Sequence, residues 1–177
     1  AMTIKKMFAG DTAYSVTGNG YTPEGKIFVG ETEVTELPDQ LKQLLISGSL
    51  CNDTILIKED GEWTILGDPT EGAIVVVSEK AGIKNADFKK ENPRLYEIPF
   101  SSDTKKMTTV NQMGNELIVS SKGALEMLLE ACKFIYTSTG IREITEEDVK
   151  NINHFYASFA SEALRVLTIC GKRMQMD

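Results

Sequence analysis

The sequence predicts an α+β domain in which an antiparallel or mixed β-sheet is covered by helical layers. Short alternating segments come in pairs separated by turn residues, as β-hairpins do. Segments with helical spacing of apolar residues lie between these pairs. The 177 residues, 41% hydrophobic and 25% charged, are enough to bury one core and have an ordinary globular composition. Without an internal repeat or a low-complexity linker, we expect a single domain over residues 1–177.

Charge and composition exclude several classes of function. The net charge of -7 argues against a nucleic-acid partner. No apolar run approaches the roughly 18 residues of a membrane helix, and no signal peptide is recognisable, so we expect no direct membrane insertion. Three widely spaced cysteines suit free thiols in a reducing compartment. With His154 as the only histidine, neither a zinc site nor a histidine-dependent triad is expected.

The first fifty residues are expected to form three strands and one helix. Two of the strands lie within Thr3–Thr17 and are joined by a turn at Gly10-Asp11. The third strand is Ile27–Val29, and the helix is Glu36–Leu50. Gly20–Lys26 spells G-x-x-x-x-G-K, the start of a phosphate-binding P-loop. That motif needs Ser or Thr where Ile27 stands, and a helix where a strand is expected. We therefore reject a P-loop.

A helix start at Asp68 dominates the next segment. Asp68 is the expected N-cap, Pro69 the first helical residue, and Glu71 the acid of a capping box. This pattern alone indicates no more than a good helix start. The other expected elements are a hairpin of Thr54–Lys58 and Glu62–Leu66 before this helix, which ends near Lys80, and a short helix over Asn85–Asn92 after it.

The stretch Leu95–Met107 joins a strand to small hydroxyl residues and lysines. Pro99 disrupts strand hydrogen bonding and is expected at a sheet edge or a bulge. Phe100 beside it could face outward, and an aromatic plate near amines suits a nucleotide. Because most strand phenylalanines belong to the core, the stretch by itself favours a core residue.

The last third is expected to continue as hairpins and helices. The expected elements are a hairpin of Lys106–Gln112 and Glu116–Ser120, a helix over Ser121–Cys132, a hairpin of Lys133–Thr137 and Ile141–Ile144, a helix capped by Thr145 with Val149, Ile152, Phe155, Phe159 and Ala163 on one face, and a strand over Arg165–Cys170. Lys122 would then lie at the positive end of a helix dipole, where a lysine gains from a nearby anion. A solvated lysine is the alternative. His154 is expected to be a surface or packing residue.

Several of these stretches occur together in one protein family, in the same order. They are Cys51-Asn52-Asp53, Gly67-Asp68-Pro69-Thr70-Glu71-Gly72-Ala73, Ile98-Pro99-Phe100-Ser101-Ser102 with Lys105 and Met107, Ser121-Lys122-Gly123-Ala124, and Ala163-Leu164-Arg165-Val166-Leu167. The chain resembles the nucleotide-binding (N) domain of P-type cation-transporting ATPases, in particular the calcium-pump-like type II group. This resemblance covers nearly the whole chain and implies a twisted, mostly antiparallel β-sheet flanked by helix pairs.

The resemblance implies a role for each residue of an ATP site. Phe100 would stack on adenine, which contributes on the order of 1–3 kcal/mol per base, and Glu71 would face the adenine amino group. Lys105 and Lys122 would line the pocket and Arg165 would lie toward the phosphates. The remaining residues of the implied site are Ser102, Met107 near the base, and Gly123. Calcium-pump members often carry arginine where Ser102 stands, so one phosphate contact is expected to be absent.

The family's phosphorylation motif, magnesium motifs and membrane helices are not present in this sequence. The resemblance therefore implies a fragment of a pump, a cytoplasmic domain of a cell-membrane protein. It would bind ATP, as Mg-ATP in the parent enzyme, without binding a metal alone or hydrolysing ATP. Its partners would be the phosphorylation and actuator domains of the same parent chain. Two alternatives stay open: a self-sufficient ATP-using enzyme such as a kinase, and an interaction module with an unused pocket.

Overall fold

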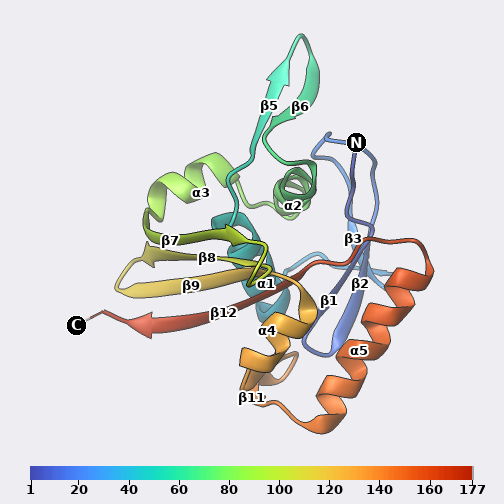
Figure 1. Ribbon diagram of the computed structural model, residues 1–177. Coiled ribbons are helices and arrows are strands. Elements are labelled where there is room, and N and C mark those ends of the chain that lie inside the picture. The colour runs from blue at the N-terminus through green and yellow to red at the C-terminus, as the bar shows by residue number, and fades with distance from the viewer. Residues whose placement is uncertain (177) are drawn as a thin grey trace.

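The computed structural model describes residues 1–176 and has the predicted α+β class, with every strand pair antiparallel. The strands do not form one sheet. They are distributed over two four-stranded sheets and two separate hairpins (Figure 1). The N-terminal sheet has the order β1-β2-β3-β4, and the central sheet has the order β12-β9-β8-β7.

The N-terminal sheet contains β1 (Lys6–Ala9), β2 (Thr12–Val16), β3 (Ile27–Val29) and β4 (Thr32–Glu33). The first three strands and the turn at Gly10-Asp11 were predicted, whereas the two-residue β4 was not. The rejection of the P-loop is confirmed, because Ile27 begins a strand and no helix follows Lys26. The sheet packs its buried side chains, among them Met7 and Tyr14, against Leu41 and Leu45.

Helix α1 (Asp39–Leu50) lies between the two large sheets and joins their cores. Its predicted start at Glu36 is wrong, because Pro38 has extended backbone angles and stands at the N-cap. Leu45 belongs to the core of the N-terminal sheet, whereas Ile46 and Leu50 pack on Ile118 of the central sheet. Ser47 accepts a hydrogen bond of 3.0 Å from the Ser120 hydroxyl, so small residues let helix and sheet approach closely.

The central sheet contains β7 (Arg94–Ser101), β8 (Lys106–Met113), β9 (Glu116–Gly123) and β12 (Thr168–Gln175). The predicted hairpin of β8 and β9 is confirmed. The largest boundary differences from the predictions are in β9 and β12. Residues 121–123 continue β9 instead of starting a helix, and Arg165 lies in the loop before β12 instead of at its first position.

The other predicted elements are present. They are the hairpin of β5 (Ile55–Glu59) and β6 (Glu62–Leu66), helices α2 (Pro69–Lys80), α3 (Asn85–Glu91), α4 (Leu125–Ala131) and α5 (Glu146–Ser161), and the hairpin of β10 (Phe134–Thr137) and β11 (Gly140–Glu143). Thr145 caps α5 in a complete capping box with Asp148. Ala163 lies beyond the helix with φ of 61°, so its predicted place on the helix face is wrong.

Helix α5 runs alongside β1 (Figure 1). Phe155 stacks on Phe8 of β1 with ring centroids 4.4 Å apart. His154 is exposed and meets Phe155 edge-on, as expected for a surface or packing histidine. Within residues 1–176, no helix is both long and apolar enough to cross a membrane.

Candidate functional site

Glu71 at the start of α2 and Lys122 on β9 form an ion pair at the centre of the candidate site. Lys122 Nζ lies 2.5 Å from Glu71 Oε2 and donates a second hydrogen bond, of 2.6 Å, to the carbonyl of Cys51. The two side chains are only 9% and 15% exposed. Lys122 is therefore neither solvated nor at a helix start. Its anionic neighbour is a carboxylate of the same chain.

The carboxylate of Glu71 does not close the predicted capping box. Asp68 caps α2 as predicted, because its side chain accepts a hydrogen bond of 3.0 Å from the Glu71 backbone N–H. The reciprocal bond is missing, since the backbone N–H of Asp68 donates to Thr54 Oγ1 instead. The Glu71 side chain is thereby directed toward Lys122, away from the helix end that it was predicted to cap.

The loop after α1 completes the surroundings of Glu71. Thr54 Oγ1 donates to Glu71 Oε1 at 3.1 Å, and the backbone N–H of Asp53 lies 3.4 Å from both carboxylate oxygens. Asn52 holds this loop, because its side chain accepts from the backbone N–H of Thr54 and donates to the backbone carbonyl of Glu71. Sequence reasoning did not assign Thr54 to the site. The Asn-x-Thr spacing, typical of an Asx-turn, was the available signal.

Two basic residues anchor the other side of the same loop. Arg94 pairs with Asp53 at 2.7 Å, and both Arg94 and Lys89 donate to the carbonyl of Asn52. Burial lowers the pKa of Lys89, and the positive charge of Arg94 lowers it further. Burial likewise raises the pKa of the neighbouring Cys51 thiol, although Lys122 opposes this. The loop is thus fixed from both sides before any ligand binds.

A β-bulge in β7 decides which way Phe100 faces. Ile98 pairs with Thr108 and Ser101 pairs with Lys106, so β7 has one more residue than β8 between these pairs. Side chains alternate between the faces of a sheet. Phe100 immediately precedes Ser101, which pairs with Lys106, so Phe100 points away from that face and lies on the face of Met107. In a regular strand without the bulge, Phe100 would lie two residues after Ile98 and would share the opposite face with Ile98 and Thr108.

Phe100 lies on the same face of the central sheet as the Glu71–Lys122 ion pair. Met107 lies directly opposite Lys122 in the β8–β9 ladder, and both side chains point to the same face. Met107 is buried, whereas Phe100 is 64% exposed. The expectation from the stretch alone, that Phe100 is a core residue, is wrong. The expectation that Pro99 marks a sheet edge or a bulge is confirmed, since β7 is an edge strand and is bulged there.

Gly123 and Lys105 are held together by the backbone. The carbonyl of Lys105 accepts a hydrogen bond of 3.1 Å from the backbone N–H of Ala124. A Cβ atom on Gly123 would lie 2.2 Å from that carbonyl oxygen. The close approach therefore requires glycine at this position. Lys105 itself has φ of 54° in the β7–β8 turn and an exposed side chain.

Ser102 and Arg165 stand further from the ion pair. Ser102 is exposed in the β7–β8 turn. Arg165 is exposed in the loop that leads to Thr168, which pairs with Gly123. Three residues of extended chain span at most about 11 Å, so Arg165 approaches the same end of the central sheet without joining the Glu71–Lys122 pair. It also lines a separate cavity of about 630 Å³.

The site can therefore offer three kinds of contact at one end of the central sheet. Phe100 supplies an exposed aromatic face, the Glu71 carboxylate supplies hydrogen-bond acceptors, and Lys105 supplies a mobile cation. In residues 1–176 no cluster of three or more His, Cys, Asp or Glu side chains could hold a metal ion.

Comparisons with known proteins place these residues in a family. The sequence profile described as "P-type ATPase, cytoplasmic domain N" matches residues 40–177. "Cation-transporting ATPase pma1" of Synechocystis is 33% identical over 98% of this chain and 20% of its own length. "Calcium-transporting ATPase" of Bacillus subtilis is 33% identical over 95% and 19%, respectively. "Sodium/potassium exporting P-type ATPase cta3" of Schizosaccharomyces pombe is 37% identical over 76% and 13%. The chain thus spans a fifth or less of these relatives.

Proposed function

The chain belongs to the P-type ATPase family as a cytoplasmic domain N, and on that premise we propose that it binds ATP for an ATP-driven cation transporter. The adenine ring stacks on Phe100, and the chain presents the γ-phosphate to an aspartate of a separate phosphorylation domain. In this proposal residues 1–177 are one nucleotide-binding domain of a larger protein. Its phosphorylation and actuator domains are the partners of this chain, and the parent enzyme uses Mg-ATP.

The orientation and exposure of Phe100 carry the proposal. An aromatic side chain that is 64% exposed contributes little to the core, yet a bulge turns it toward the face of Met107 and Lys122. Leaving such a ring in water is unfavourable unless a ligand covers it. A nucleotide base does so by stacking, which is worth about 1–3 kcal/mol.

The other groups suit the remaining parts of ATP. The Glu71 carboxylate accepts from Lys122, Thr54 and the Asp53 N–H, and a carboxylate has about four acceptor positions, so one more donor such as the adenine amino group fits. Met107 forms the apolar floor beneath the base, and Gly123 keeps the Lys105 turn close. Lys105, Ser102 and Arg165, all exposed, are assigned to the phosphates.

An ATP titration of the ¹⁵N-labelled chain tests the proposal. Amide signals near Phe100, Glu71 and Lys122 are expected to shift in a saturable manner as ATP rises into the millimolar range. Inosine triphosphate, which lacks the exocyclic amine, is expected to bind more weakly because the Glu71 carboxylate loses its donor. No shift in these three regions at millimolar ATP would reject the proposal.

The variant Phe100→Ala separates nucleotide binding from an interaction module with an unused pocket. We expect at least about a fivefold loss of ATP affinity, from the loss of ~1 kcal/mol or more of stacking, and an unchanged thermal midpoint. Tyr96→Ala is the matched control, because Tyr96 lies on the same strand, is 63% exposed, and pairs with Val110 on the opposite face. Unchanged ATP affinity in Phe100→Ala would favour the interaction module.

A further inference from the structure

Two of the three cysteines meet on neighbouring elements although they are far apart in the chain. Cys132 directly follows α4, and Cys170 is the third residue of β12. α4 packs on β12, and a hydrogen bond joins the two thiols. The fold therefore brings together a pair of sulfur nucleophiles. The proposed ATP site uses neither of them.

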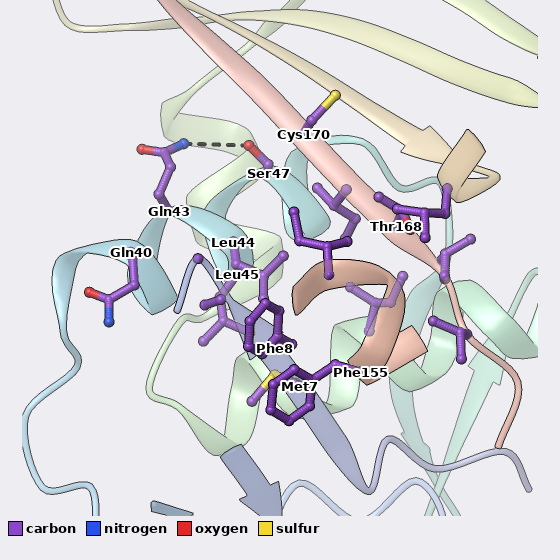
Figure 2. A pocket seen from close by; sticks show the side chains of 18 of the residues that line it. Met7, Phe8, Gln40, Gln43, Leu44, Leu45, Ser47, Phe155, Thr168 and Cys170 are labelled. Atoms are coloured by element: carbon purple, nitrogen blue, oxygen red, sulfur yellow. Dashed lines mark hydrogen bonds between the residues drawn. The ribbon is translucent and has the colours of Figure 1, made fainter. Parts of the chain in front are cut away.

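The register of β12 directs Cys170 away from α1. Gly171 pairs with Ser120, whose hydroxyl contacts Ser47 of α1, so Gly171 faces that helix. Side chains alternate along a strand, and Cys170 therefore points to the opposite face. Figure 2 shows its side chain leaving β12 on the side away from Ser47. The Cys170 thiol thus meets Cys132 at the end of α4 and not a group of α1.

The third cysteine has a different environment. Cys51 is 0% exposed, and its thiol donates a hydrogen bond of 3.5 Å to the carbonyl of Met107. Cys132 and Cys170 are instead partly exposed, and both line the cavity of about 630 Å³. A solute as small as hydrogen peroxide can therefore reach this pair from solvent, whereas Cys51 is shielded from it.

The two partly exposed thiols differ in reactivity. The hydrogen bond from Cys170 lowers the pKa of Cys132 to about 7, although burial opposes the shift. The same hydrogen bond and burial raise the pKa of Cys170, whereas the positive charge of Lys106 acts in the opposite direction. The thiolate is the reactive form of cysteine. Near neutral pH the pair therefore holds a thiolate beside a thiol that stays protonated.

We propose that Cys132 and Cys170 form a reversible disulfide when the chain is exposed to hydrogen peroxide. The Cys132 thiolate attacks one peroxide oxygen, the O–O bond breaks, and the products are a sulfenic acid and hydroxide. The sulfur of Cys170 then attacks the sulfenic sulfur. The S–S bond forms, the S–O bond breaks, and the hydroxyl leaves as water with the Cys170 proton. Overall, two thiols lose two electrons and the peroxide becomes two water molecules.

The bond would tie the end of α4 to the central sheet. Between the two cysteines lie β10, β11 and α5. The packing of α5 on the rest of the chain is chiefly against β1. A disulfide would close this segment into a loop and restrict the unfolded chain, which stabilises the folded state. In a reducing compartment such a bond is transient and typical of redox sensing.

Peroxide treatment followed by peptide mapping without reductant is the direct test. Trypsin cleavage after Lys and Arg places the three cysteines in separate peptides, 43–58, 123–133 and 166–172. We expect the second and third to be recovered from the monomeric chain as one linked peptide, which dithiothreitol separates, with Cys51 still a thiol. Absence of this linked peptide, or a linkage through Cys51, would overturn the proposal.

Serine variants test the role of each thiol. In Cys170→Ser we expect a sulfenic acid that reacts with dimedone to accumulate at Cys132, because no thiol resolves it. In Cys132→Ser, Cys170 is expected to react with peroxide several-fold more slowly than Cys132 does in the parent chain. Cys51→Ser is the matched control and should form the disulfide as the parent does. Faster oxidation of Cys170 than of Cys132 would contradict the assigned order of attack.

Thermal unfolding tests whether the bond fits the folded chain. We expect oxidation to raise the thermal midpoint by about 5 °C or more, because the bond closes a long loop, and dithiothreitol to reverse the change. Peroxide-treated Cys132→Ser accounts for oxidation of methionines and should show no rise. An oxidised parent chain that unfolds at a lower temperature than the reduced one would show that the thiols are not placed for a bond, and would reject the proposal. None of these readouts depends on ATP binding.

Discussion

At the scale of single residues, the Glu71–Lys122 pair holds three segments together. It joins the first turn of α2 to β9, and Lys122 also binds the carbonyl of Cys51 at the end of α1. Removing one member of a mostly buried pair leaves the other charge without its partner. We therefore predict that Lys122→Met lowers the free energy of unfolding by about 3 kcal/mol, as measured by urea denaturation.

The double variant Lys122→Met with Glu71→Gln is the control for this prediction. It is expected to be more stable than Lys122→Met alone, because no uncompensated carboxylate remains. Strictly additive losses would contradict the coupling. The same experiment is the folding control for the functional assignment, because a loss of ATP affinity in a Lys122 variant can be interpreted only if the variant is folded.

The thiols of Cys132 and Cys170 give a prediction that depends on pH. A hydrogen bond from the Cys170 thiol lowers the pKa of Cys132 to about 7, although burial opposes the shift. Alkylation of Cys132 by iodoacetamide is therefore expected to accelerate with a midpoint near this pH. In Cys170→Ala the midpoint should rise toward ~8.5, the value of an ordinary thiol. Cys51, which is 0% exposed, serves as the unreactive internal reference.

Peptide mapping by mass spectrometry assigns the alkylation rates to each thiol. A midpoint that is the same in Cys170→Ala as in the parent chain would contradict the hydrogen bond. A folded protein is required for the comparison, so the rates are measured beside a thermal unfolding profile of each variant.

The sequence located the members of the pair but not their contact. The pattern at Asp68 placed Glu71 correctly at the third position of α2, yet it also predicted a capping bond that Thr54 makes in its place. Local spacing predicts a bond between neighbours in the chain. It contains no information on Thr54, fourteen positions upstream of Asp68, whose hydroxyl accepts from the Asp68 N–H in place of the Glu71 carboxylate.

At the scale of elements, the bulge in β7 is the feature on which the candidate site depends. The two residues Pro99 and Phe100 lie between the pairs Ile98–Thr108 and Ser101–Lys106, where β8 has only Met107. Deleting Pro99 would restore regular pairing, with Phe100 opposite Met107 and therefore still on the face of the ion pair. We predict that ATP affinity falls less in this deletion than in Phe100→Ala, in a chain that still folds because β7 is an edge strand.

Deleting Leu95 is the matched control for this prediction. A second register shift lies between Arg94 and Tyr96, so the deletion removes an extra residue from the same strand without changing the register at Phe100. Both deletions leave Phe100 on the face of Met107, so ATP affinity is expected to fall less in each of them than in Phe100→Ala. A loss in the Pro99 deletion as large as that in Phe100→Ala, with affinity kept in the Leu95 deletion, would contradict the assigned orientation of Phe100.

Boundaries between elements were predicted least well where strands pair over long distances. Residues 121–123 resemble a helix start by composition, yet β9 continues through them because Gly123 pairs with Lys106 on one side and Thr168 on the other. Residues 171–175 were not predicted as strand, although β12 uses them to pair with β9. Such pairings depend on segments that lie far apart in the chain, so local patterns cannot fix their ends.

At the scale of the whole molecule, α1 organises the arrangement that the sequence described only as a class. The antiparallel pairing and the helices between hairpins were predictable, because both follow from local periodicity and turns. The separation into two large sheets was not. It arises because α1 buries residues 45–50 between the sheets, with Leu45 contacting one core and Leu50 the other. A sequence pattern shows that a helix has apolar faces, but not that two sheets share them.

In the proposed function this chain binds ATP, and a separate phosphorylation domain accepts the γ-phosphate. The last prediction follows from this assignment. The groups assigned to ATP are a stacking ring, cations and a carboxylate occupied by Lys122, all of which bind without supplying an acceptor for the γ-phosphate. The purified chain is therefore expected to bind ATP and to release phosphate no faster than a buffer blank. Phe100→Ala makes the test decisive. Phosphate release that disappears in this variant would belong to the chain and would favour a self-sufficient ATP-using enzyme, whereas release that persists in it would come from a contaminant.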